Sequence, residues 1–349
     1  MPTAAEEGFA MPPEWSAQEA IWISWPVDDP RHWGGQKREI ILDRFVVLAA
    51  AISRFEIVRI NAIPGTEDEI RERCLRAKAV PERLEIFPHL HNDVWCRDHG
   101  PIFLKHRESG NLAISDWEFN AWGGKFAPWD ADNSIPSQIS QQLRLPSYTG
   151  GMILEGGAIE INGCDQLLTT EAVLLNPNRN PHLNREQIEQ KLCQTLGVKE
   201  VLWLEKGIEG DDTDGHIDDL ARFCADDLIA VCVDRDPSSP NHRVLDANLH
   251  RLREFRTPSG RPFELVEIPM PAACEVPGWR LPILPASYVN FLIVNGGLLV
   301  PTFRQGRNDD RALGTLRELF PDREVVGIDC LDLVEEGGTL HCLTQQQPA

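Results

Sequence analysis

Two residues that could carry out nucleophilic catalysis stand in unusual company in this sequence. Cys342 lies near the C-terminus in GGTLHC, next to His341, and His216 lies in GDDTDGHIDD among five aspartates. A cysteine with a distant histidine and acids is a candidate nucleophile set, in which the histidine moves protons. A lone cysteine is more often a small buried apolar residue, as we expect for the other eight.

The aspartate-rich stretch admits two plainer interpretations, a solvated acidic loop and a metal site. A calcium loop of the D-x-D/N-x-D/N-G type is excluded, because counting from Asp212 the fifth position is His216 and the sixth is Ile217. A zinc site would need further histidines or cysteines at close spacing. We therefore predict that His216 and Asp218 begin a strand and point to one face, and that the neighbouring carboxylates raise the pKa of His216.

Two further motifs supply acids. In NDVWCRDHGPIF, Trp95 and Asp98 at a strand end could hold a planar cation, although Asp98 could instead cap a turn, with Arg97 paired to it or to Asp93. In LEGGAIEI, Glu155 precedes two glycines within a strand pair. The glycines either form a plain bulge or bend the strand so that the acid points into a pocket.

Three acids, Asp98, Glu155 and Asp218, are thus candidates for one site, which is more than a cysteine protease needs to orient its histidine. Several carboxylates around a thiol make sense if the substrate is a planar cation with many N–H donors. A monosubstituted guanidinium has five such donors and accepts bidentate pairing. The residues therefore indicate a guanidinium substrate.

The composition of the 349 residues fits a small-molecule enzyme of the cytoplasm. Hydrophobic residues make up 42% and charged residues 25%, an ordinary globular balance. We find no apolar signal region at the N-terminus and no apolar run near the ~20 residues of a membrane helix. The formal charge of -20 argues against a nucleic-acid partner and suits a cationic substrate. The nine cysteines show no CxxC pair, so we expect reduced thiols.

A recurring order of elements would position these residues. Two strands, a helix and a further strand recur in five ββαβ units of roughly 50 to 75 residues. The helices are expected at 39–55, 134–145, 184–197, 241–255 and 309–321. Five units favour a closed ring, an α/β propeller formed as a single domain by residues 1–349, in which strand ends of all units converge on one pocket. A tail strand that completes the last unit would hold Cys342 in place.

At these residues the chain resembles the agmatine deiminase family of the guanidine-modifying (pentein) superfamily. The resemblance covers almost the whole chain. It implies a five-bladed α/β propeller, the architecture that the repeat predicts independently. The matching motifs are MPPEW, WISWP, NDVWCRDHGP, FNAWGG, LEGGAIEING, LLTTEAVLLNPNRNP, GDDTDGHIDDLARF, YVNF and GGTLHCLTQQQP.

The resemblance implies a role for each central residue. Cys342 would be the nucleophile, and His216 would act as general acid and then general base. Asp98 and Asp218 would grip the guanidinium, while Glu155 would support the histidine or the same ion. No metal and no organic cofactor is implied.

The chain departs from the family pattern near the expected pocket mouth. It has GDDTDGH where the family has a sequence close to GDETNGH, and the stretch between WGG and PWD is short. There Trp95 would form a wall of the pocket, and Asp212 stands where the family has another acid. These departures bear on the substrate more than on the class of reaction.

The implied reaction is hydrolysis of agmatine to N-carbamoylputrescine and ammonia through a thiouronium on Cys342, a step of polyamine and putrescine biosynthesis from arginine. Alternatives remain open: deimination of free arginine, peptidyl-arginine or methylated arginine, transfer of the amidino group to an amine, and a non-catalytic propeller that binds a partner. Free arginine would need a pocket cation for its carboxylate, for which Arg97 and Lys125 are candidates. The oligomeric state stays open, a homo-oligomer included.

Overall fold

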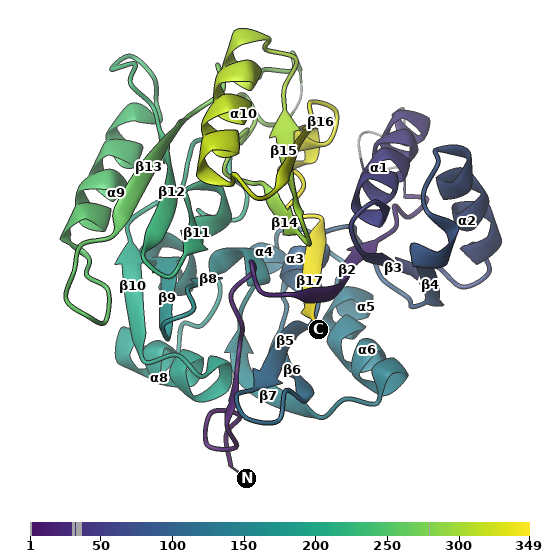
Figure 1. Cartoon of the computed structure of the whole chain (residues 1–349), viewed down its shortest axis with the longest axis horizontal. Coiled ribbons are helices and arrows are strands. Elements are labelled where there is room, and N and C mark those ends of the chain that lie inside the picture. Colours follow the sequence, from purple (N-terminus) through teal and green to yellow (C-terminus); the bar gives the residue numbers. More distant parts are fainter. Residues whose placement is uncertain (1, 30–31, 33–36, 279) are drawn as a thin grey trace.

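The computed structural model describes residues 2–29, 32, 37–278 and 280–349. In that part of the chain the strands form five sheets that surround a common centre, and the longer helices lie toward the outside (Figure 1). This is the α/β propeller that the repeat predicts. None of the helices in the described ranges combines the length and the apolar character needed to cross a lipid bilayer.

Four units run in chain order, each with an antiparallel strand pair followed by a helix and a parallel strand. This is the predicted ββαβ order. The units are β5–β6–α6–β7 (Ile102–His106, Leu112–Glu118, Ile135–Leu143, Ser147–Ile153), β8–β9–α8–β10 (Glu160–Ile161, Gln166–Thr170, Arg185–Leu196, Glu200–Leu204), β11–β12–α9–β13 (Ala221–Ala225, Leu228–Val233, His242–Glu254, Glu264–Pro269) and β14–β15–α10–β16 (Leu292–Val294, Gly297–Thr302, Arg307–Leu319, Glu324–Asp329). The short strand β1 (Phe9–Ala10) pairs with β5.

The fifth sheet joins the two ends of the chain. Its elements are β17 (Thr344–Pro348), β2 (Gln18–Ser24), α1 (Arg38–Ser53), β3 (Ile57–Ala62), α2 (Glu67–Arg76) and β4 (Leu84–Pro88). Strand β17 pairs antiparallel with β2, and Figure 1 shows the two side by side, yellow against purple. The expectation that the tail completes the last unit is wrong. The last unit already has β14 as the antiparallel partner of β15, whereas the first unit takes that partner from the tail.

Apolar side chains at helical spacing hold α1 against this sheet. Ile41, Phe45 and Ile52 lie on one face of the helix and are fully buried in the same cluster as Val58 and Ile60 of β3. Burying one such side chain contributes about 1.5–3 kcal/mol. All of β17 is buried as well, so the tail next to Cys342, although it is the edge strand of its sheet, is packed against the rest of the protein and is not frayed.

Short helical turns precede the first strands of several units. Helix α3 (Cys96–His99) leads into β5, the 3-10 turn η3 (Gly156–Ala158) leads into β8, and η4 (Ile217–Asp219) leads into β11. The other short helices are η2 (Pro81–Arg83), α4 (Ala121–Gly124), α5 (Asp130–Asn133), α7 (Glu171–Leu174) and η5 (Val334–Glu336). Because the first strand of each unit occupies an equivalent place in the ring, the turns before these strands meet near the centre.

Candidate functional site

A cavity of about 260 Å³ lies among these turns and contains much of the predicted site. Four predicted residues line it: Trp95, Asp98, Asp212 and Cys342. Its size suits a small molecule, since pockets for drug-sized ligands are usually larger. The three other predicted residues, Glu155, His216 and Asp218, are buried directly behind this lining.

Cys342 lies in the turn before β17 and is 5% exposed. Its sulfur accepts a hydrogen bond from Asn290 Nδ2 at 3.1 Å and lies 3.7 Å from Asp218 Oδ2. The backbone N–H of Arg97 donates to the carbonyl oxygen of Cys342 at 3.1 Å, which ties the tail to α3. The thiol is therefore fixed by contacts from three other units of the ring.

A glycine allows the indole of Trp95 to approach the thiol. A Cβ atom at Gly338 would lie only 2.5 Å from Trp95 Cζ3 and 3.1 Å from Cys342 Sγ. Any larger residue at 338 would push the two side chains apart. The Gly-Gly before Cys342 thus gives Trp95 its place as a wall of the cavity.

The surroundings of Cys342 keep its thiol protonated in the empty site. Burial raises the pKa of the thiol well above its usual range, and the nearby charges of Asp218, Asp219 and Asp98 raise it further. A positive charge in the cavity would oppose these effects. The thiol is therefore suited to become a nucleophile when a cation binds beside it.

His216 lies at the N-terminal end of η4 with its ring buried. Its Nδ1 atom is 3.6 Å from Asp98 Oδ1, and neither ring nitrogen has a hydrogen-bond partner among the described residues. Burial lowers the pKa of His216, but the carboxylates Asp98, Glu155 and Asp218 outweigh burial and raise the pKa above its ordinary value. The predicted direction is confirmed, and the ring can donate a proton near neutral pH.

The prediction that His216 and Asp218 begin a strand is wrong. Strand β11 begins only at Ala221, Asp218 lies in the 3-10 turn before it, and His216 immediately precedes that turn. Asp211 explains the difference, because its carboxylate accepts from the backbone N–H groups of Thr213 and His216. Such local side-chain bonds replace the strand ladder and bend the chain.

Asp98 lies on α3, where its carboxylate accepts from Trp122 Nε1 at 3.0 Å and from the N–H of Gly157 at 3.1 Å. Burial raises the pKa of Asp98 to about 7, although the charge of His216 lowers it. The alternative in which Arg97 pairs with Asp98 or Asp93 is wrong. The Arg97 side chain instead donates to the His341 carbonyl and to Gln346, on the side of the tail.

Glu155 is completely buried and paired with a buried arginine. Arg179 Nε donates to Glu155 Oε1 at 2.5 Å, while Oε2 has no partner in the described structure. The glycines after Glu155 form the turn η3 rather than a bulge within a strand pair. A Cβ at Gly157 would lie 2.6 Å from His216 Nδ1 and 2.7 Å from Asp98 Oδ1, so the glycine is needed for close approach.

Asp218 is held from one side only. Its Oδ2 atom accepts from His341 Nδ1 at 2.7 Å, and its Oδ1 atom is buried without a partner in the described structure. Burial raises the pKa of Asp218, but the hydrogen bond and charge of His341 lower it by more, so that the net shift is downward. The group is therefore an ionised carboxylate with one free oxygen.

Several hydrogen-bonding atoms thus lie unsatisfied around one cavity: Glu155 Oε2, Asp218 Oδ1 and both ring nitrogens of His216. Buried polar atoms without partners are uncommon, so each needs a reason. A ligand that carries a positive charge and several N–H groups would satisfy the carboxylates here. A guanidinium has this chemistry.

The mouth of the cavity is acidic, and its cations are already paired. Lys125 Nζ donates to Asp214 at 2.7 Å and to the Asp212 carbonyl at 2.6 Å. Arg280 pairs with Asp212 and Glu336 and lies over the Phe126 ring. Five carboxylates line the cavity against these two cations: Asp93, Asp98, Asp132, Asp212 and Glu336.

Metal-ligand atoms also gather next to the thiol. Donor atoms of Asp218, Asp219 and Cys342 lie within 4.8 Å of one another, as do those of Glu14, Glu160 and His341. In the second group Arg222 already donates to both glutamates. In the first group, acids crowd around a thiol, and a cationic substrate would neutralise their charges as a metal ion would.

Sequence reasoning missed several residues that build the site. Asn290 contacts the thiol, Arg179 pairs with Glu155, Trp122 donates to Asp98 and His341 donates to Asp218. Each lies in a motif on which the resemblance rests. The signal for Asn290 was a polar residue in the apolar run YVNFLIV, because a buried amide usually has specific partners.

Sequence and fold are both similar to those of known proteins. The profile of the Porphyromonas-type peptidyl-arginine deiminase family matches residues 10–348. An agmatine deiminase of Pseudomonas syringae pv. tomato is 39% identical over 369 residues, which covers 99% of this chain and 97% of that protein. The structure of the Enterococcus faecalis agmatine deiminase superposes with a TM-score of 0.92 at 34% identity, covering 100% of this chain and 98% of that one. The C. jejuni agmatine deiminase with substrate bound gives a TM-score of 0.87 at 32% identity, covering 98% and 96%.

Proposed function

This chain belongs to the Porphyromonas-type peptidyl-arginine deiminase family, and on that premise we propose that it is an agmatine deiminase. It hydrolyses agmatine to N-carbamoylputrescine and ammonia. One observation carries the proposal. The thiol of Cys342 lines a cavity next to buried carboxylate oxygens that lack partners, the environment that a guanidinium would complete.

Binding comes first in the proposed mechanism. Asp98 and Asp218 accept N–H groups of the guanidinium and fix its plane, and Glu155 Oε2 offers a further acceptor. Trp95 forms one wall, against which the planar cation stacks. The bound positive charge lowers the pKa of the thiol, so Cys342 loses its proton to solvent.

The chemistry then proceeds in two halves with His216 as the proton carrier. The Cys342 sulfur attacks the guanidinium carbon and forms a C–S bond. The bond to one NH₂ group breaks, and His216 protonates that group, so that it leaves as ammonia. A thiouronium remains on the sulfur. Water attacks the same carbon while His216 accepts one proton, and the C–S bond breaks to restore the thiolate. The second proton of the water passes to solvent as the neutral ureido product leaves.

The charges at the cavity mouth favour agmatine over arginine. Agmatine ends in an ammonium group, which suits the surplus of carboxylates, and Asp212 would receive it by exchanging its ion pair with Arg280 for one with the ammonium. Arginine would bring an additional carboxylate, whose burial requires an available cation. Lys125 and Arg280, the cations of the described lining, are already engaged by acids. Arg97, the other cation considered from the sequence, is buried toward the tail.

We further propose that the reaction takes place in the cytoplasm and contributes to putrescine and polyamine biosynthesis from arginine. The nine cysteines are all unpaired in the structure, as in a reducing compartment. Association into homo-oligomers belongs to the same set of proposals and is tested by light scattering of the purified protein.

A substrate panel tests the function directly. Purified protein receives agmatine, free arginine or an arginine-containing peptide, and ammonia and ureido product are measured in parallel, with Cys342→Ala as the control. We expect the highest kcat/KM with agmatine and equal amounts of both products. A higher kcat/KM for arginine or for the peptide would refute the substrate assignment, and ammonia released by the alanine variant would refute the nucleophile.

A further inference from the structure

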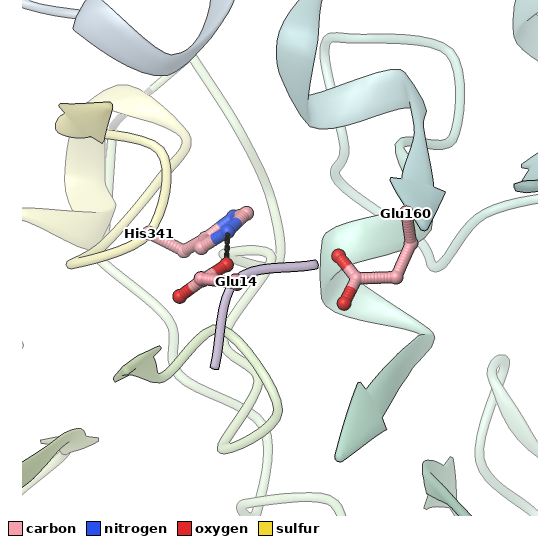
Figure 2. A group of neighbouring side chains, drawn as sticks. All are labelled: Glu14, Glu160 and His341. Carbon is pink, nitrogen blue, oxygen red and sulfur yellow. Dashed lines mark hydrogen bonds and ion pairs between the residues drawn. The ribbon is translucent and has the colours of Figure 1, made fainter. Parts of the chain in front are cut away.

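A row of buried charged side chains continues behind Asp218, away from the cavity. His341 Nδ1 contacts Asp218 Oδ2 at 2.7 Å, and His341 Nε2 contacts Glu14 Oε2 at 2.8 Å. Arg222 pairs with Glu14 and Glu160. Figure 2 shows His341 above Glu14, joined by the dashed contact, with Glu160 on the opposite side. None of these side chains except Asp218 has a part in the mechanism described above.

This row is not an open metal site. Glu14, Glu160 and His341 have suitable donor atoms, but the guanidinium of Arg222 donates to both glutamates and supplies the positive charge. It also donates to the carbonyl oxygen of Phe291 at 2.7 Å. Because Arg222 already supplies the positive charge, His341 must have another role between the two carboxylates.

Both nitrogens of the His341 ring face carboxylate oxygens at hydrogen-bond distance. An ionised carboxylate only accepts, so a proton must lie on each of the two contacts. Arg222 and His341 offset the effect of burial on Glu14 and lower its pKa, and His341 does the same for Asp218. Burial and the charges of Arg222 and Arg97 lower the pKa of His341, against Glu14 and the bond to Asp218, which raise it. The two contacts fix the ring orientation from both ends, whether the second proton lies on the ring or on a carboxyl group.

The ring contact decides which oxygen of Asp218 remains available. His341 engages Oδ2, and Oδ1 is the buried atom without a partner. His341 is also the chain neighbour of Cys342, whose sulfur lies 3.7 Å from the same Oδ2 atom. One turn of the tail thus positions both the Asp218 carboxylate and the thiol. A rotation of the Asp218 carboxylate would disturb both at once.

We propose that His341, held in place by Glu14, is a positioning residue that locks the Asp218 carboxylate so that Oδ1 faces the guanidinium. This inference rests on the proposed function. In this role His341 and Glu14 act only by positioning Asp218 and do not touch the substrate themselves. A merely structural role for the ring would make its two nitrogens equivalent in their effect on substrate, whereas a positioning role makes Nδ1 the one that matters.

Two substitutions separate the nitrogens. The amide nitrogen of His341→Asn takes the place of Nδ1 and can still donate to Asp218, while that of His341→Gln takes the place of Nε2 and can still donate to Glu14. Agmatine affinity is measured calorimetrically in the Cys342→Ala background. We expect the Asn variant to bind within about threefold of its parent. The Gln variant should bind about 10- to 100-fold more weakly, the size of one lost charge-assisted hydrogen bond. Equal affinities for the two variants would overturn the proposal.

Two controls guard this comparison. His91 is another buried histidine, bonded through both nitrogens to the carbonyls of His89 and Trp25, so its Asn and Gln variants should show no such split in affinity. Glu14→Asp keeps the charge beside Arg222 but shortens the reach to Nε2. It should weaken agmatine binding about three- to tenfold and gives the deciding measurement if the His341 variants do not fold. Unchanged affinity in Glu14→Asp would contradict the role of Glu14.

A second readout needs no substrate and separates this proposal from the function. The rate of Cys342 alkylation by iodoacetamide is followed against pH in the empty enzyme. Without a donor on Oδ2, the charge of Asp218 acts fully on the sulfur, which also faces Asp98 and Asp219. The midpoint of the alkylation rate against pH should therefore be about one pH unit higher in His341→Gln than in His341→Asn. Coincident profiles would refute the positioning role even if the protein deiminated a different guanidine.

Discussion

Replacing Asp98 by Asn should make the protein more stable at pH 8 while removing its activity. Burial raises the pKa of Asp98 from an ordinary 3.8 to about 7. At pH 8 the ionised form therefore costs the fold about 4 kcal/mol, at 1.36 kcal/mol for each pKa unit. The sign follows from linkage. A carboxyl whose pKa is raised on folding destabilises the folded state fully above about pH 7, and this cost vanishes as the pH falls toward 3.8.

The amide brings a cost of its own. Both oxygens of Asp98 accept, one from Trp122 Nε1 and one from the N–H of Gly157. Whichever way the Asn amide turns, its NH₂ group faces one of these donors and leaves it unsatisfied, which costs about 1–3 kcal/mol. The net gain at pH 8 is about 1–3 kcal/mol. At pH 5 the relieved cost is below about 2 kcal/mol, so the gain disappears or reverses.

Thermal unfolding of wild type and Asp98→Asn at both pH values measures the difference. For a chain of this length the gain at pH 8 corresponds to a rise in Tm of about 1–4 °C. Asp332→Asn is the matched control. Burial raises the pKa of Asp332, but Arg44 and Arg304 lower it to a net downward shift, so its removal should destabilise at pH 8 and less so at low pH. Equal destabilisation by Asp98→Asn at both pH values would refute the reasoning, as would retained activity.

Further outcomes follow from the same site. The negative charge with which Asp98 binds the guanidinium exists only above its pKa of about 7. For this reason kcat/KM for agmatine should fall as the pH drops below 7, and a flat profile would contradict this. His216→Gln should lower kcat about 10²- to 10⁴-fold with little change in affinity, and a loss confined to KM would argue against proton transfer. Arg179→Met leaves Glu155 buried without its partner and should cost about 3–5 kcal/mol in denaturant unfolding, largely restored by adding Glu155→Gln; no restoration would show that the pair does not act alone. 2-Chloroacetamidine should label Cys342 faster than iodoacetamide does, with protection by agmatine, and peptide mass mapping that finds equal labelling of other cysteines would count against it.

Much of the fold and of the candidate site could be predicted from the sequence. Apolar periodicity gave the order of strands and helices in each unit, because burial of one face sets the period of an element. The seven predicted residues do gather at one cavity. The local backbone conformations could not be predicted as well. Asp218 lies in a 3-10 turn, and His216 and Glu155 immediately precede such turns, so none of the three is in a strand. Side-chain to backbone bonds such as those of Asp211 compete with the strand ladder.

By itself the sequence determined which chemistry is possible, because residue types and motifs limit the donors, acceptors and nucleophiles present. Only the tertiary structure decided how they meet. Each of the five units contributes from the turn before its first strand: Asp98, Glu155, His216 with Asp218, Asn290, and Cys342. The last of these strands, β17, comes from the far end of the chain and pairs with β2. Contacts such as Cys342 to Asp218 or His341 to Glu14 join residues more than a hundred positions apart. No local pattern encodes them, since they arise when the ring closes and buried charges must find partners.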